Sequence, residues 1–121
     1  EAVKDRPIFT TRTVDDSALV GMYTSITIGA DGLGLISYYT GGADLKVAHC
    51  INTACTVVES YTLDSVGDVG QYTSIAIGPD GLGMISYYDV TNQDLKLAHC
   101  KNISCSEADI YTLDDTDSRG K

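Results

Sequence analysis

The sequence GMYTSITIGADGLGLISYY, at residues 21–39, returns at residues 70–88 as GQYTSIAIGPDGLGMISYY. Fifteen of the 19 positions are identical, and the two copies lie 49 residues apart. Self-similarity at one spacing is the signature of a repeat architecture, in which each repeat forms one supersecondary unit. The fold therefore follows from the structure of a single unit and from the way successive units pack.

The similarity extends over almost the whole of each unit. DLKVAHCINTAC from Asp44 matches DLKLAHCKNISC from Asp94 at eight of 12 positions, and each unit closes with Tyr-Thr-Leu-Asp. A weaker closing segment, Thr11 to Asp15, precedes the first copy and aligns with Ser60 to Asp64. We expect a leading segment with the last strand of a preceding unit, a first unit, and a second unit with an acidic tail, at residues 1–20, 21–69 and 70–121.

Each unit contains four short segments typical of β-strands. In the second unit they are residues 72–78, 82–88, 94–100 and a segment ending at 110–113, separated by polar or Gly-containing turns. No segment has a sustained helical period. Four strands in about 50 residues are typical of a propeller blade. The sequence predicts an all-β fold of two four-stranded antiparallel β-propeller-like blades, plus one extra N-terminal strand at Thr10 to Val14.

The pattern Ile-Gly-x-Asp-Gly-Leu-x-x-Ile-Ser-Tyr-Tyr-Asp, followed by Asp-Leu-Lys-x-Ala-His-Cys and a second Cys, resembles a known repeat. That repeat occurs in tandem in large secreted, mostly uncharacterised bacterial proteins. The resemblance covers nearly all of residues 21–114 and departs at Gly34 and Gly83, where the family would have Pro. It implies a propeller-like fold and a secreted protein, and it implies no activity.

All four cysteines lie within the repeats, as Cys50-x4-Cys55 and Cys100-x4-Cys105. Opposed positions of a short hairpin are close enough for a disulfide, so we expect one local disulfide in each unit. The alternative is a metal site that uses the histidine before the first cysteine, His49 or His99. Adjacent strand residues point to opposite faces, which disfavours that site. Disulfides indicate an oxidising compartment, extracellular or periplasmic.

The chain carries 17 acidic and eight basic residues, a net charge of −9. Between Thr13 and Ser118 the only basic residues are Lys46, Lys96 and Lys101. A nucleic-acid surface needs clustered Lys and Arg, so nucleic acid is excluded as a partner. No apolar run approaches the ~20 residues of a membrane-spanning helix. We also expect no cofactor.

Residues shared by both copies are explained most simply by what every blade needs. Asp31 and Asp80 are expected to be turn residues that bind backbone amides two residues on. His49 and His99 are expected to be buried, hydrogen-bonded imidazoles. A looser similarity, to the Asp-box turn of sialidase-type propellers, touches only residues 30–32 and 79–81. Sialidase chemistry needs an arginine cluster, yet all three arginines lie near the chain ends. We therefore expect no catalytic site.

The paired tyrosines are the candidate ligand-binding residues: Tyr38, Tyr39, Tyr87 and Tyr88. In each pair one ring points to the opposite face from the other, so one can pack between blades while the other either packs in the core or rim or offers a sugar-stacking surface. The copies differ most at residues 40–43 and 89–93, so any blade-specific recognition is expected in that loop.

Three functions fit these observations. The first is a non-catalytic extracellular module for binding or structural spacing, as part of a larger repeat protein. The others are a piece of a propeller hydrolase and a lectin assembled from several chains, with one site per blade. Two blades leave two apolar outward faces, so we expect self-association through these faces, and a glycan or protein is the expected ligand.

The disulfide prediction can be tested by intact mass. Reduction of the purified protein should add two hydrogen atoms for each disulfide, four in total, because each sulfur of the pair gains one. Mass spectrometry with and without reductant measures this directly. An unchanged mass, with four thiols that react before reduction, would favour the metal alternative.

Overall fold

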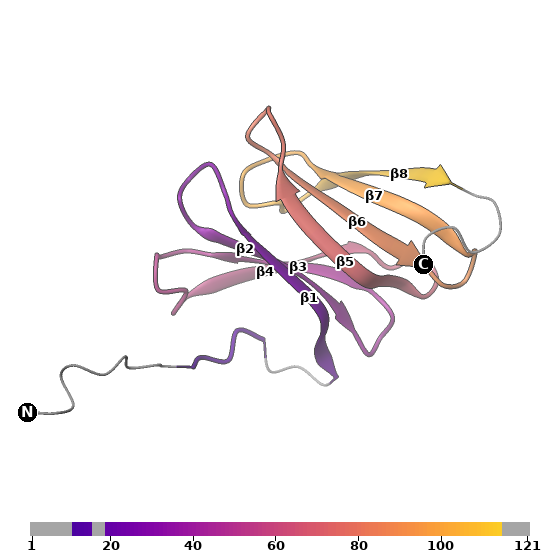
Figure 1. Ribbon diagram of the computed structural model, residues 1–121. Helices are drawn as coiled ribbons and strands as arrows, with labels where there is room; N and C mark the ends of the chain where they lie inside the picture. Colours follow the sequence, from indigo (N-terminus) through magenta and orange to yellow (C-terminus); the bar gives the residue numbers. More distant parts are fainter. Residues whose placement is uncertain (1–10, 16–18, 115–121) are drawn as a thin grey trace, which may run out of the picture.

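The computed structural model describes residues 11–15 and 19–114, and its strands form two four-stranded antiparallel sheets (Figure 1). The first sheet, in the order β1-β2-β3-β4, and the second, in the order β5-β6-β7-β8, are meanders of neighbouring strands. The strand bounds are β1 Val20–Ile28, β2 Gly34–Thr40, β3 Leu45–Cys50, β4 Val58–Asp64, β5 Val69–Ile77, β6 Gly83–Asp89, β7 Asp94–Cys100 and β8 Ala108–Asp114. The predicted all-β fold with two four-stranded sheets is confirmed.

The turn between the first two strands of each sheet is set by its Asp-Gly pair. The side chain of Asp31 accepts a hydrogen bond from the Leu33 amide at 3.0 Å, and Asp80 does the same for Leu82 at 3.0 Å. Gly32 and Gly81 have φ angles of 79° and 81°, which a glycine adopts without steric penalty. The prediction that these aspartates are turn residues is confirmed.

The two sheets pack face to face, with β5 against the first sheet (Figure 1). We call the side of each sheet that bears Ile26 or Ile75 its front face, and the opposite side its back face. The back face of the first sheet packs on the front face of the second, and the residues that meet there include Leu35, Leu45 and Val47 on one side and Val69, Ile75 and Ile85 on the other. Most of these side chains are fully buried. This contact forms the core of the molecule.

The extra N-terminal strand is a wrong prediction for the residues that the structure describes. Thr11 to Val14 are not in a strand, while Thr10 lies outside the described residues. A strand needs a neighbouring strand for its backbone hydrogen bonds, and neither of the two described sheets includes this segment. The alignment of residues 11–15 with residues 60–64 is nevertheless reflected in the structure, because Asp15 makes the contacts that Asp64 makes one unit later.

The cysteine loops also differ from the predicted hairpin. Cys50 lies opposite Val58 in the strand register, not opposite Cys55. Residues 51–57 form the connection, closed by a hydrogen bond from the Ile51 amide to the Val57 carbonyl at 2.8 Å. Cys55 lies inside this loop with a φ of 56°. The disulfide therefore closes a turn beyond the end of the strand instead of bridging two strands.

Two equivalent glycines test the packing between the sheets. Gly70 and Gly21 both have positive φ, 106° and 93°. A Cβ on Gly70 would lie 2.9 Å from the Leu45 Cα, whereas one on Gly21 would meet nothing within 4 Å. Gly21→Ala should lower the free energy of unfolding by about 1 kcal/mol through backbone strain. Gly70→Ala should cost about 1–3 kcal/mol more, because it also pushes on a neighbouring backbone.

Urea unfolding followed by circular dichroism measures both variants. Equal losses of unfolding free energy in the two variants would show that the close approach of Gly70 to Leu45 adds nothing to the cost of a side chain there.

Candidate functional site: the inter-unit latch and the tyrosine cluster

Each unit is joined to the segment before it by one carboxylate. Asp64, the last residue of β4, accepts hydrogen bonds from the Tyr87 hydroxyl at 2.7 Å and the Lys96 ammonium at 2.9 Å. Asp15 repeats this arrangement for the first unit, 2.7 Å from the Tyr38 hydroxyl and 3.3 Å from the Lys46 ammonium. We call each of these triads, Asp64 with Tyr87 and Lys96 and Asp15 with Tyr38 and Lys46, a latch.

The Asp64 carboxylate is buried and ionised. Burial acts to raise its pKa, but hydrogen bonds from Tyr87, Lys96 and the Val66 amide, with the Lys96 charge, outweigh burial and hold the pKa below its ordinary value. Burial and the adjacent carboxylate raise the pKa of Tyr87, so this hydroxyl stays protonated and donates. The three donors stabilise the buried Asp64 charge, and removal of one of them would lower the stability of the fold because the charge would lack a hydrogen bond.

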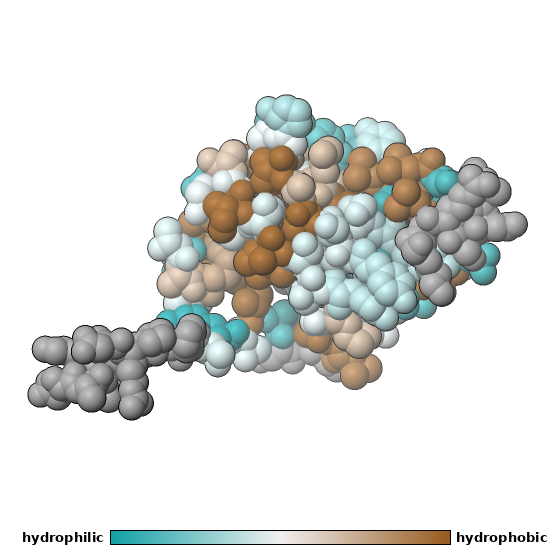
Figure 2. All heavy atoms as spheres, viewed as in Figure 1, coloured by the Kyte–Doolittle hydropathy of each residue, from teal (hydrophilic) through white to brown (hydrophobic). Residues whose placement is uncertain are grey.

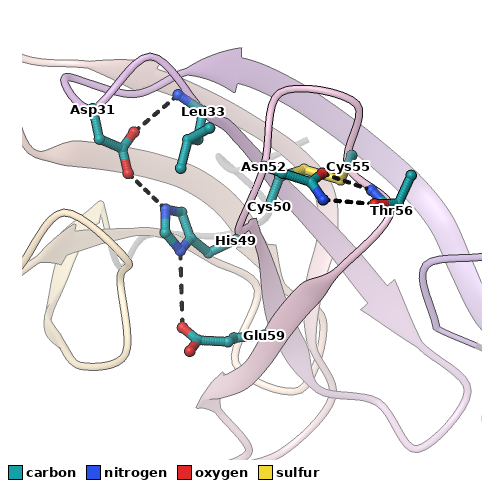
Figure 3. The surroundings of a disulfide bond; sticks show 8 residues. All are labelled: Asp31, Leu33, His49, Cys50, Asn52, Cys55, Thr56 and Glu59. Carbon is teal, nitrogen blue, oxygen red and sulfur yellow. Dashed lines mark hydrogen bonds and ion pairs between the residues drawn. A yellow bond between two sulfur atoms is a disulfide. The ribbon is translucent and has the colours of Figure 1, made fainter.

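A second repeated contact links the first turn of each unit to its third strand (Figure 3). His49 Nε2 lies 2.8 Å from Asp31 Oδ2, and His49 Nδ1 lies 3.9 Å from Glu59 Oε1. His99 and Asp80 repeat the contact at 2.7 Å. Burial acts to raise the pKa of Asp31, and the hydrogen bonds from His49 and Leu33 lower it below its ordinary value. The predicted hydrogen bond is confirmed for both histidines, and burial is confirmed for His49 but wrong for His99, whose side chain is 32% exposed. The sequence did not predict that the partner is the turn aspartate.

Both cysteine pairs are disulfides, Cys50–Cys55 and Cys100–Cys105, each with its Cα atoms 4.8 Å apart. Asn52 supports the first loop (Figure 3), because its side-chain Oδ1 accepts a hydrogen bond from the Thr56 amide at 2.9 Å. Within residues 11–15 and 19–114, no group of three or more His, Cys, Asp or Glu is arranged to hold a metal ion. The cysteines are therefore used to close loops.

The four tyrosines predicted to bind a ligand are all buried. Tyr38 and Tyr87 are 4% and 1% exposed and serve the latches. Tyr39 and Tyr88 point to the other face, as predicted, and each lies beside the tyrosine of the neighbouring Tyr-Thr-Ser-Ile segment. These neighbours, Tyr23 and Tyr72, were not predicted as site residues, although their repetition in both units was a visible signal.

Tyr23 and Tyr72 bring one ring from each sheet together at the surface. Their ring centroids are 4.7 Å apart with planes tilted by 55°. Tyr39 lies edge-on to Tyr23 at 5.7 Å, and Tyr88 lies 6.2 Å from Tyr72. We call these four residues the tyrosine cluster. Tyr23 and Tyr72 are 39% and 50% exposed. The cluster thus has two buried rings beneath two exposed ones.

The backbone at the exposed pair is held in an unfavourable conformation. Tyr23 and Tyr72 have φ angles of 53° and 55°, and both lie where the pairing of the first two strands of the sheet shifts register. A left-handed conformation costs a residue with a Cβ about 1–2 kcal/mol, and such strain concentrates at functional sites. The charge interaction with Tyr72 raises the pKa of Tyr23 above its ordinary value.

Polar groups border the cluster. Asp68 accepts a hydrogen bond from the Tyr39 hydroxyl at 2.7 Å, and the Gln71 amide lies 3.5 Å from the same hydroxyl. The Asp68 amide donates to Thr91 at 2.8 Å, which connects the cluster to the loop where the two copies differ most. Hydrogen-bonding groups therefore lie at the hydroxyl of Tyr39, one of the two buried rings of the cluster.

Comparisons with protein-family models, curated proteins and solved structures found no match to this chain. The described part of the chain contains no helix with the length and apolar character of a membrane span.

The second latch predicts a pH-dependent effect of Tyr87→Phe. At neutral pH the variant should lose about 1.5–3 kcal/mol of stability, because it removes a buried hydrogen bond to a charged group. A carboxyl whose folded pKa is lowered stabilises the fold above its unfolded pKa of about 4, and this contribution disappears as pH falls through the folded pKa. The deficit of Tyr87→Phe should therefore shrink as the pH is lowered below about 4.

Urea unfolding at a series of pH values tests this effect. Tyr111→Phe is the control, because Tyr111 is 49% exposed and is not part of a latch. A deficit that does not change with pH would contradict the role of the Asp64 charge.

Proposed function

We propose that this chain is a non-catalytic, β-propeller-like repeat module of a secreted protein, used for binding or structural spacing. The observation that carries the proposal is the repeated latch. Residues that the two units share, Tyr38 and Tyr87 with Lys46 and Lys96, bind the aspartate that closes the preceding segment. Shared residues that join units are what an array of blades requires. The two disulfides suit an extracellular or periplasmic protein.

The outward faces of the two sheets support the same proposal. Ile26, on the open front face, is 62% exposed, whereas its counterpart Ile75 in the core is 7% exposed. A cavity of about 530 Å³ lies over the open face and is lined in part by Ile26, Ile36 and Tyr38. On the open back face Leu113 is 55% exposed, while its counterpart Leu63 packs on the core.

The open front face of the first sheet is equivalent to the front face of the second sheet, which is covered in the core. The open back face of the second sheet is likewise equivalent to the covered back face of the first. Figure 2 shows brown, apolar residues over the C-terminal parts of β1 and β5, where Figure 1 places the upper ends of these strands. Because Ile26 and Leu113 are exposed where their counterparts Ile75 and Leu63 pack in the core, the back face of the second sheet of one chain is complementary to the front face of the first sheet of another. We propose that copies of this chain associate head to tail through these faces.

Light scattering over a range of concentrations tests this association. The wild-type chain should show a mass above that of one chain, and Ile26→Asp should shift it to a single chain, because a carboxylate on the open front face opposes burial. Val57→Asp is the control, since Val57 is 54% exposed in the β3–β4 loop. A wild-type protein that stays a single chain at every concentration would overturn the association.

A further inference from the structure

The tyrosine cluster has features that packing between the sheets does not require. Its two upper rings, Tyr23 and Tyr72, remain 39% and 50% exposed although buried rings lie directly beneath them. Both are held out by left-handed backbone at a register shift, and both units keep this arrangement. Tyrosine has an apolar ring face and a polar hydroxyl, so the exposed pair forms an amphipathic surface.

The pair is composite, because it needs both units. Tyr23 comes from β1 and Tyr72 from β5, and the sheets are held in place there by a short chain of hydrogen bonds. The Ser37 hydroxyl donates to Thr73 at 2.9 Å, and the Thr73 hydroxyl donates to the Tyr23 carbonyl at 2.6 Å. The positions of the two rings are therefore fixed relative to each other before any ligand arrives, which reduces the entropy lost on binding.

We propose that Tyr23 and Tyr72 bind a neutral saccharide by stacking on the apolar face of a pyranose ring. Tyrosine combines an apolar ring face with a polar hydroxyl, which suits a ligand whose ring carries C–H groups on its faces and hydroxyls at its edge. Asp68 and Gln71, which lie at the hydroxyl of Tyr39 in the same cluster, are a carboxylate and an amide whose remaining hydrogen-bonding atoms can bind sugar hydroxyls. The net charge of −9 disfavours an anionic sugar. The inference rests on the binding role in the proposed function.

Calorimetric titration of the intact chain with soluble pentasaccharides of glucose, mannose, xylose and N-acetylglucosamine tests the site. At least one should bind, and Tyr72→Ala and Tyr23→Ala should each weaken binding about tenfold or more, because each removes half of the stacking surface. Tyr72→Phe should retain most of the affinity. Tyr111→Ala, which removes a tyrosine of similar exposure on β8, should leave it unchanged.

Each variant is first compared with the wild type by circular dichroism, so that loss of folding is separated from loss of binding. Three results would overturn the site: no heat with any of the four sugars, sugar binding that survives the double variant Tyr23→Ala with Tyr72→Ala, or binding of a proline-rich peptide in place of the sugars. Ile26→Asp distinguishes this proposal from self-association, because it blocks association through the open front face and leaves Tyr23 and Tyr72 of the same chain in place. This variant should keep its affinity for the sugar as a single chain, and loss of sugar binding in it would show that the site needs a second copy, which overturns the site within one chain.

Discussion

The packing of the first sheet on the second is the contact on which the other features of the molecule depend. Leu35, Leu45 and Val47 are fully buried only because the front face of the second sheet covers them. Each such side chain contributes about 1.5–3 kcal/mol when it leaves water. The same contact brings Asp64 to Tyr87 and sets β1 beside β5. Neither the latch nor the exposed tyrosine pair would exist in a single unit.

Much of the fold could be predicted because the same pattern of strands and turns occurs in both units. Side chains alternate along β7, so Leu95, Leu97 and His99 share one face and Lys96 points to the other, where it contacts Asp64. Pairing of the cysteines followed from their spacing alone. The shape of their loops did not, because a left-handed residue at Cys55 displaces it from the strand register. Local geometry of that kind has no signature in the spacing of two cysteines.

The site was harder to predict than the fold for a physical reason. The paired tyrosines were predicted as ligand-binding residues because they are adjacent, but adjacent positions in a strand establish only that the two rings point to opposite faces. Which face is covered depends on the next sheet. Tyr23 and Tyr72 are exposed through a shift in register that interrupts the alternation, so counting along the strand gives no orientation for them. The latch was hidden for a related reason, since its carboxylate and its donors belong to different units.

The position of the latch has a consequence for how such a chain can grow. The carboxylate lies at the very end of one unit, and the hydroxyl and ammonium that bind it lie in the middle strands of the next. A tandem duplication of any segment of one repeat length therefore copies both halves of the joint, whatever its starting point within the unit. The new boundary is compatible with its neighbours without a second, coordinated substitution, and the disulfide that each copy carries forms without reference to the others. Selection can then act on the variable loops, because the residues of the latch are copied intact with each repeat.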